Sequence, residues 1–314
     1  MKNLSDSDYT QSLGVKAARK LATTTKSAPM MESITPRWLC MLTPWVNVVS
    51  GTYRVNKRKM SRKIEMISGH VGEPAIPETF VDYQEEPREY PLSAVQSIVK
   101  IHTRVSELYS SPMDQLKEQL RLTTLEMKER KEWEMVNNPQ FGLLNSVAPS
   151  QRIRTRKGPP TPDDLDELLT KVWKRPAFFL AHPMAIAAFG RECTRRGVPP
   201  PTTMIHGSPF MTWRGVPLIP SDKLEISDRS NGGHSVASTD ILLLRVGEKE
   251  QGVIALRDDA LNSEYGHSLS IRFMGINDKA LASYLLSMYF SVAVLSDDAL
   301  ACLENVDTGY YHEY

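Results

Sequence analysis

Apolar positions in the middle third of the chain recur at the spacing of a helix. Between residues 93 and 110 they fall every three or four positions, as on one helical face: Val95, Ile98, Val99, His102 and Val105. A second helix is predicted to start where Ser111 supplies a cap and Pro112 the first helical position. Its apolar face continues through Leu116, Leu120, Thr123 and Met127. The pattern predicts a long spine-like helix, with His102 in a structural role on the helix before it.

The first 92 residues do not show the pattern of a self-contained domain. Residues 13–26 predict a short helix, whereas the apolar segment 34–49 is interrupted by Pro36 and Pro44. That segment is predicted either to lie as an arm on another surface or to form a strand and a short helix in the chain's own core. Residues 51–92 alternate like strands and hold several prolines, which predicts an extended hairpin with a return.

The second half predicts strands alternating with two capped helices. Thr161, Pro162 and Asp164 stand in the order of cap, first-turn proline and first-turn acid, which predicts a helix start. A short strand is predicted at 178–181 and a helix from Pro183. Further strands are predicted within 210–222, 241–247 and 269–276, with residues 228–240 as a loop rich in Gly, Ser and Asn.

The longest stretch without charge runs from Ala280 to Ser296, slightly shorter than the roughly 20 apolar residues of a membrane helix. Ser283, Ser287 and Ser291 recur within it every four residues, which on a helix gives one face of small side chains. Tyrosines inside the stretch weaken the interpretation as a lipid span. We therefore expect a buried core element and no integral membrane insertion.

Composition narrows the function further. The chain has 314 residues, 41% of them hydrophobic, which is enough for about two domains. A net charge of +1 argues against a protein that coats nucleic acid over its whole surface. The three cysteines lie far apart in the sequence, at Cys40, Cys193 and Cys302, and the N-terminus lacks the apolar core of a secretory signal. We therefore expect a cytoplasmic location.

Catalytic and metal motifs are weak. The nucleophile elbow is nearly matched around Ser235 and Ser268, each preceded by a histidine, but the second glycine is missing both times. Acidic residues gather at 163–167 and at 297–298, where they could in principle bind Mg²⁺. The positive end of a helix dipole is the simpler explanation, because no further acids stand at clear ligand spacing. No phosphate-binding glycine motif occurs. The sequence therefore assigns the chain no catalytic residue, cofactor or metal.

Many segments, taken in order, carry a resemblance to a known family. They lie between residues 21 and 314 and include LATTTKS (21–27), ITPRWL (34–39), GTYRVN (51–56), PETFVDYQEEPREYPL (77–92), IHTRVSELYSSPMDQLKEQLRLT (101–123), TPDDLDELLTKVW (161–173), AHPMAIAAFGRE (181–192), RGVPPP (196–201), GVPLIPSDK (215–223) and YHEY (311–314). Over roughly Leu13 to Tyr314 the chain closely resembles the family-two, A-type encapsulins.

The resemblance implies an α+β chain with the tailed-phage major capsid protein fold. It divides the chain into an N-terminal arm (1–50), an extended loop (51–92), a peripheral domain with the spine helix (93–160), and an axial domain with returning peripheral-domain strands and the C-terminus (161–314). It further implies that many copies, sixty in the minimal icosahedral shell, enclose a cysteine desulfurase in sulfur metabolism or storage. The shell itself is then not an enzyme and binds no cofactor.

Two sets of residues are candidates for shell functions. Arm residues expected to lie across a neighbouring subunit are Trp38, Leu39, Leu42 and Trp45. Residues expected to line a pore are Arg195, Arg196, Thr202, Thr203 and His206. The basic run from Lys57 to Lys63 can face a cargo segment if it points inward, or a membrane or nucleic acid if it points outward.

Two other functions stay open from the sequence. A prophage-type capsid protein that packages DNA shares the implied fold, and the near-neutral charge disfavours it. A serine-dependent hydrolase using Ser235 or Ser268 predicts a small discrete oligomer and turnover without cargo.

Overall fold

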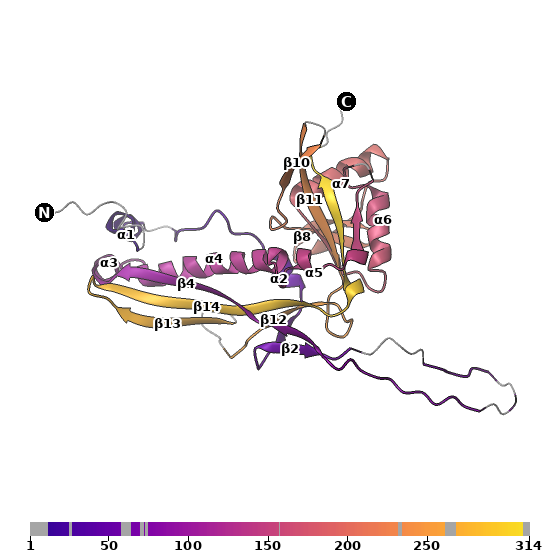
Figure 1. Ribbon diagram of the computed structural model, residues 1–314. Coiled ribbons are helices and arrows are strands. Elements are labelled where there is room, and N and C mark those ends of the chain that lie inside the picture. Colours follow the sequence, from indigo (N-terminus) through magenta and orange to yellow (C-terminus); the bar gives the residue numbers. More distant parts are fainter. Residues whose placement is uncertain are drawn as a thin grey trace.

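The computed structural model describes residues 12–24, 27–57, 64–69, 72, 75–156, 158–231, 234–260 and 268–309. Their fold consists of an elongated layer of sheet and helix, a second sheet that stands at one end of that layer, and a narrow segment that projects beyond both (Figure 1). The side chains of residues 229–231, 234 and 235 lie outside the description.

The first sheet is organised around β14 (Leu281–Val294). One edge of β14 pairs antiparallel with β4 (Ser93–His102), and residues 282–288 also pair with β13 (Leu269–Ile276), so β4 and β13 lie on opposite edges. β12 (Val253–Arg257) continues along the β13 edge, and β1 (Trp45–Asn47) joins β12 in parallel. Five strands of the described chain therefore form this sheet.

The predicted helix at 93–102 is wrong, because these residues form β4. Alternate side chains of the strand, including Val99 and Ile101, are buried, whereas Ile98 is 50% exposed on the other face. Ile98 and His102 fit the helical spacing, but in the strand they lie on the face opposite to Val99 and Ile101. A short helix, α3 (Thr103–Leu108), follows.

The spine helix is α4 (Gln115–Asn137), which covers one face of the first sheet (Figure 1). Its N-cap is Asp114, whose carboxylate accepts the N–H of Lys117 at 3.0 Å, so the helix starts three residues later than Ser111 and Pro112 suggested. Apolar side chains of α4 enter the core shared with β4 and β14: Leu120, Met127, Met135 and Val136. A single turn of helix, α5 (Leu143–Ser146), comes next.

The second sheet holds a separate apolar core under two helices. Its strands run in the order β5 (Arg152–Arg154), β15 (Leu300–Asp307), β11 (His234–Leu244), β6 (Phe178–Ala181), β9 (Val216–Pro220), β8 (Ser208–Trp213) and β7 (Thr202–Ile205), with β10 (Ser227–Asn231) on β11. Helices α6 (Pro162–Lys171) and α7 (Pro183–Arg195) pack against it. The predicted starts of both helices are confirmed, with a reciprocal cap between Thr161 and Asp164.

Two expectations for the second half are corrected. Residues 228–240, predicted as a loop, belong largely to β10 and β11, whose antiparallel pairing runs from Ser227 with Ser238 to Asn231 with His234. The uncharged stretch from Ala280 is confirmed as a buried core element, but as strand β14. Its serines share a face because positions four apart also share a face in a strand. Within the described residues, no helix is long and apolar enough to cross a membrane.

The extended hairpin is confirmed at its base, where β2 (Thr52–Val55) pairs antiparallel with β3 (Arg88–Pro91). Beyond that base, the described residues near 56–57 and 75–87 run away from both sheets (Figure 1). Most of the basic run lies outside the described residues. The ammonium of Lys57, the first residue of the run, lies 4.0 Å from the carboxylate of Asp297. Arg54, just before the run, forms an ion pair with Glu89 at 2.7 Å.

Candidate assembly surfaces and pore region

The arm follows the spine helix residue by residue. The arm contains α1 (Val15–Ala22) and α2 (Trp38–Leu42), and between them its residues bond to successive turns of α4. These hydrogen-bonded pairs run in the same direction along both segments: Pro29 with Arg121, Ser33 with Glu126, Thr35 with Glu129 and Leu39 with Glu132. Because a helix rises about 1.5 Å per residue, the contact extends over roughly 16 Å of the spine.

Glu129 is the most connected carboxylate in this contact. It accepts the Thr35 hydroxyl at 2.7 Å, the Arg37 guanidinium at 2.7 Å and the Lys223 ammonium at 3.1 Å. Burial raises the pKa of this carboxyl, but the hydrogen bonds from Thr35, Lys223 and Arg37 together outweigh burial and lower it. Glu129 therefore joins, as a carboxylate, the arm, the spine helix and the loop between β9 and β10.

Glu132 lies one turn further along α4, and its pKa is shifted in the opposite direction. Its side chain is 2% exposed and accepts the main-chain N–H groups of Leu39 at 2.8 Å and Cys40 at 3.4 Å. These are N–H groups that the start of α2 leaves without a helical partner. Burial raises the pKa of Glu132 to about 7, because these two backbone bonds do not compensate fully for lost hydration.

The expected inter-subunit anchors contact their own chain. Leu39 is fully buried in the core that α4 shares with β4 and β14 of the same chain. Trp38 packs edge-on against Phe210 with ring centres 5.1 Å apart, and Trp45 donates its indole N–H to the Cys40 carbonyl at 2.9 Å. Leu42 packs against the same core. The arm therefore contributes a short helix and a strand to the chain's own core, and its contact with a neighbouring subunit stays a prediction.

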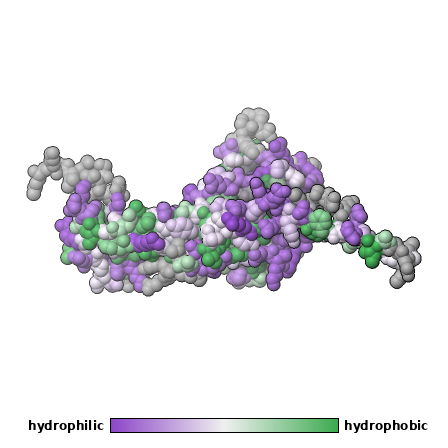
Figure 2. Space-filling view, turned by 60° about the horizontal axis from the view of Figure 1, so that its bottom comes forward, coloured by the Kyte–Doolittle hydropathy of each residue, from purple (hydrophilic) through white to green (hydrophobic). Residues whose placement is uncertain are grey.

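Large apolar side chains lie exposed on the projecting hairpin. Ile76 is 84% exposed, Phe80 66% and Tyr83 60%, and Figure 2 shows hydrophobic side chains on the segment that reaches away from the body. A second exposed apolar set lies on the edge strand β13: Phe273, Met274 and Ile276. Several large exposed apolar side chains and an edge strand are features of a surface that a partner chain covers.

The pore candidates divide between two places. Arg195 and Arg196 end α7, where both guanidiniums approach Glu192, at 2.6 Å and 3.8 Å. Arg196 also lies 3.3 Å from the carboxylate of Asp163. Thr202 and Thr203 begin β7 just after the loop that leaves this helix. Arginines at a helix C-terminus complement its dipole, so these pairs also have a structural role.

His206 does not join that group. It lies in the tight turn at the other end of β7, in a left-handed backbone conformation with φ of 49°. Its ring stacks beside Trp38 of the arm, with ring centres 6.4 Å apart. The structure therefore places His206 and Thr202 at opposite ends of β7, a strand of four residues that spans roughly 13 Å.

The weak catalytic candidates do not form a triad in the described chain. Ser268 is buried at the start of β13, and its surroundings are aromatic, thioether and cationic side chains, while the Ser235 side chain and His267 lie outside the description. The acids at 163–167 are engaged with arginines: Asp164 with Arg156, and Asp166 with Arg214. No group of three or more metal-ligating side chains occurs among the described residues.

Comparisons with solved structures define the fold. The cryoEM structure of the holo-SrpI encapsulin complex from Synechococcus elongatus PCC 7942 matches with a TM-score of 0.82 and 58% identity, covering 96% of this chain and 99% of that chain. The capsid of an empty GTA particle matches with a TM-score of 0.63 over 94% of this chain and 100% of that chain, at 13% identity. The fold is that of the tailed-phage major capsid proteins.

Sequence comparison gives the family. The family model described as type 2A encapsulin shell protein SrpI-like matches residues 50–310. The type 2A encapsulin shell protein SrpI of Synechococcus elongatus (strain ATCC 33912 / PCC 7942 / FACHB-805) is 60% identical over 298 residues, 95% of each chain. This chain belongs to the SrpI-like family of type 2A encapsulin shell proteins. It is a shell protein that assembles with copies of itself into an encapsulin nanocompartment.

Proposed function

We propose that sixty copies of this chain close into an icosahedral shell in the cytoplasm that encloses a cysteine desulfurase, and that the shell itself performs no chemistry. The observation that best supports a shell is the projecting hairpin, because its side chains Ile76, Phe80 and Tyr83 are exposed and are not buried in a core of the same chain. Large apolar contacts between copies are what a closed assembly requires. The cysteine desulfurase cargo rests on the resemblance to family-two, A-type encapsulins, and the related solved structure is a holo complex.

The role in sulfur metabolism or storage follows from that cargo. The cargo takes sulfur from cysteine, so the shell must pass small substrates while it retains the enzyme. The end of α7 with Arg195 and Arg196, and the start of β7 with Thr202 and Thr203, are proposed to line such a pore. His206 is left out of this proposal because it packs beside Trp38.

Co-expression tests the cargo directly. The shell is purified with a tagless cysteine desulfurase, and the particles are passed over a sizing column and assayed for pyridoxal-phosphate absorbance. Co-elution of the enzyme with the particles is expected. A cysteine desulfurase that elutes separately in every preparation contradicts the cargo assignment and leaves the shell assignment intact.

A DNA-packaging capsid is the alternative that shares the fold. Particles with a protein-like ratio of absorbance at 260 and 280 nm, unchanged by nuclease, are expected. A nucleic-acid spectrum that persists after nuclease treatment would favour the alternative.

A further inference from the structure

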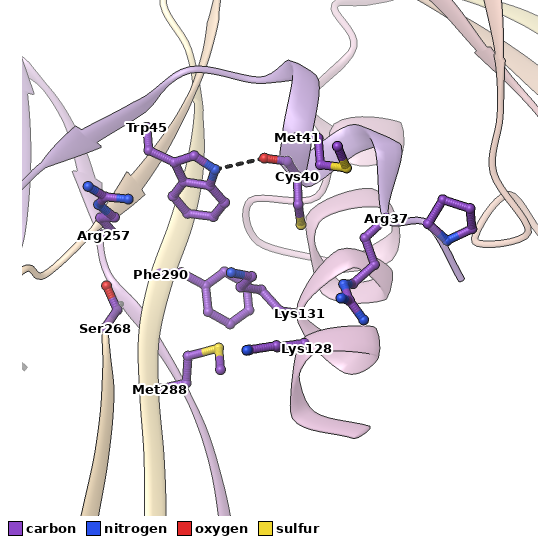
Figure 3. Close-up of a pocket in the computed structure, with 11 residues that line it drawn as sticks. Arg37, Cys40, Met41, Trp45, Lys128, Lys131, Arg257, Ser268, Met288 and Phe290 are labelled. Atoms are coloured by element: carbon purple, nitrogen blue, oxygen red, sulfur yellow. Dashed lines mark hydrogen bonds between the residues drawn. The ribbon is translucent and has the colours of Figure 1, made fainter. Parts of the chain in front are cut away.

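A cavity of about 280 Å³ lies between the arm, the spine helix and the first sheet (Figure 3). Its walls come from α2, α4, β12, β14 and the segments next to them: Pro36, Arg37, Cys40, Met41, Trp45, Lys128, Lys131, Arg257, Ser268, Met288 and Phe290. The cavity exists only because the arm folds back on its own chain, since arm residues form one whole side.

The lining separates into a cationic and an apolar part. The cations are Arg37, Lys128, Lys131 and Arg257, and none of the described residues that line the cavity is acidic. Figure 3 shows the two lysine side chains reaching from the helix toward Met288 and Phe290 of the strand. Trp45 and Met41 complete the apolar part.

Acidic side chains outside the cavity form ion pairs with the two arginines. Arg37 pairs with Glu129 at 2.7 Å, and Arg257 pairs with Asp259 at 2.7 Å. The Lys131 ammonium lies 4.5 Å from the centre of the Trp45 ring, a cation–π contact. Burial lowers the pKa of both Lys128 and Lys131, and the positive charge of Arg37 lowers both further.

We propose that this cavity binds a small organic anion with an apolar body. Its acidic group faces Lys128, Lys131 and Arg37, and its body lies against Trp45, Met288 and Phe290. The anion relieves the mutual repulsion of the cations, and its apolar body removes hydrophobic surface from water. The volume exceeds the roughly 150 Å³ that accommodates benzene, which leaves room for a ring and a carboxylate.

The site has a structural consequence as well. The anion contacts arm residues on one side and α4 on the other, so it holds the arm on the spine. A ligand that binds only the folded arrangement stabilises it in proportion to the logarithm of its concentration relative to Kd.

Calorimetry on assembled wild-type shells tests the proposal with 4-phenylbutyrate and its neutral amide as matched probes. Saturable binding of the carboxylate, at least about tenfold tighter than that of the amide, is expected. The Lys131→Met variant keeps the apolar stem and should remove that preference, whereas Lys117→Met on the same helix outside the cavity should retain it. Equal affinity for acid and amide, or a preference that survives Lys131→Met, overturns the proposal.

A second measurement needs no variant. Acetylation of lysines in wild-type shells is followed by mass spectrometry with and without 4-phenylbutyrate, and slower modification of Lys128 and Lys131, but not of Lys117, is expected by at least about threefold. Equal rates for all three lysines overturn the site. If shells bind neither probe because an acidic side chain of a second copy fills the cavity, the small-anion proposal is also overturned.

Discussion

The carboxylate of Glu132 in the spine helix accepts the main-chain N–H of Leu39 in the arm at 2.8 Å. Both side chains are buried, at 2% and 0% exposure. A main-chain N–H in the first turn of α2 therefore bonds to a side chain that lies 93 residues later in the sequence. Three residues before Glu132, Glu129 receives Thr35 and Arg37, so two buried carboxylates on neighbouring turns hold one segment of the arm.

Replacing Glu132 by Gln is predicted to change how stability depends on pH. The folded pKa of about 7 lies above the ordinary 4.5, so the folded chain binds the proton at pH values where the unfolded chain has released it. The contribution of Glu132 to the free energy of unfolding is therefore fully present below pH 4.5 and falls as pH rises to about 7. Glu132→Gln removes this loss, because an amide does not ionise.

The measurement is the melting temperature of assembled shells between pH 5 and pH 8, for the variant and the wild type. The melting temperature of Glu132→Gln relative to wild type should rise by about 4 °C over that range. Glu126→Gln, an exposed change on the same helix, is the matched control and should show no such rise. A constant difference between Glu132→Gln and wild type would exclude a raised pKa at this carboxyl.

Replacing Glu129 by Ala is predicted to loosen the arm. The change removes the acceptor of Thr35, Arg37 and Lys223, and breaking a buried ion pair costs about 3 kcal/mol. Limited trypsin digestion should cleave after Arg37 several times faster than in wild type. Glu126→Ala, which removes only a long 3.5 Å contact with Ser33, is the control. Unchanged cleavage after Arg37 would show that the arm is held elsewhere.

The sequence predicted the elements whose signals are local. The start of α6 was readable because Thr161, Pro162 and Asp164 carry the whole capping pattern within four residues. Strand β4 was not readable in this way, because it pairs with β14, nearly two hundred residues later in the sequence. Which of its faces is buried depends on the packing of α4 against it. The helix start at Asp114 was missed because serine and proline three residues earlier give the same cap signal.

The candidate site was predictable only in part, for the same reason. The exposed hairpin follows from proline and alternation, but the roles of Glu129 and Glu132 depend on an arm folded back from about 93 residues away. Acids three apart on a helix are a weak signal, since exposed helix faces carry them too. A single chain also does not contain the symmetry axes at which a pore forms.

Phe80→Asp is predicted to prevent shell closure without unfolding the subunit. Phe80 is 66% exposed and remote from both cores, so a charge there costs the isolated chain little, whereas it places a charge in an apolar contact between copies. Sedimentation should show small species with a wild-type circular dichroism spectrum. Glu78→Gln, a nearby exposed change, should leave assembly intact. Normal particles from Phe80→Asp would place the inter-subunit contact elsewhere.

Changing Arg195 and Arg196 to Gln is predicted to slow the entry of small anions several-fold. The two guanidiniums are the exposed positive charge at the end of α7, and such charge raises the local concentration of anions. Iodide quenching of a fluorophore attached to enclosed cargo reports the entry rate by stopped flow. Arg214→Gln, which removes one exposed positive charge in the β8–β9 turn, is the control for a change of charge elsewhere on the surface. Equal quenching rates in all three shells would remove the arginine pair from the pore.

Assembly of the chain on its own tests the central claim most directly. The protein is expressed alone, purified without cross-linking and imaged by negative-stain electron microscopy at micromolar concentration. The account predicts closed, hollow particles of one size. Monomers or small oligomers in repeated preparations, with a folded circular dichroism spectrum, would contradict it.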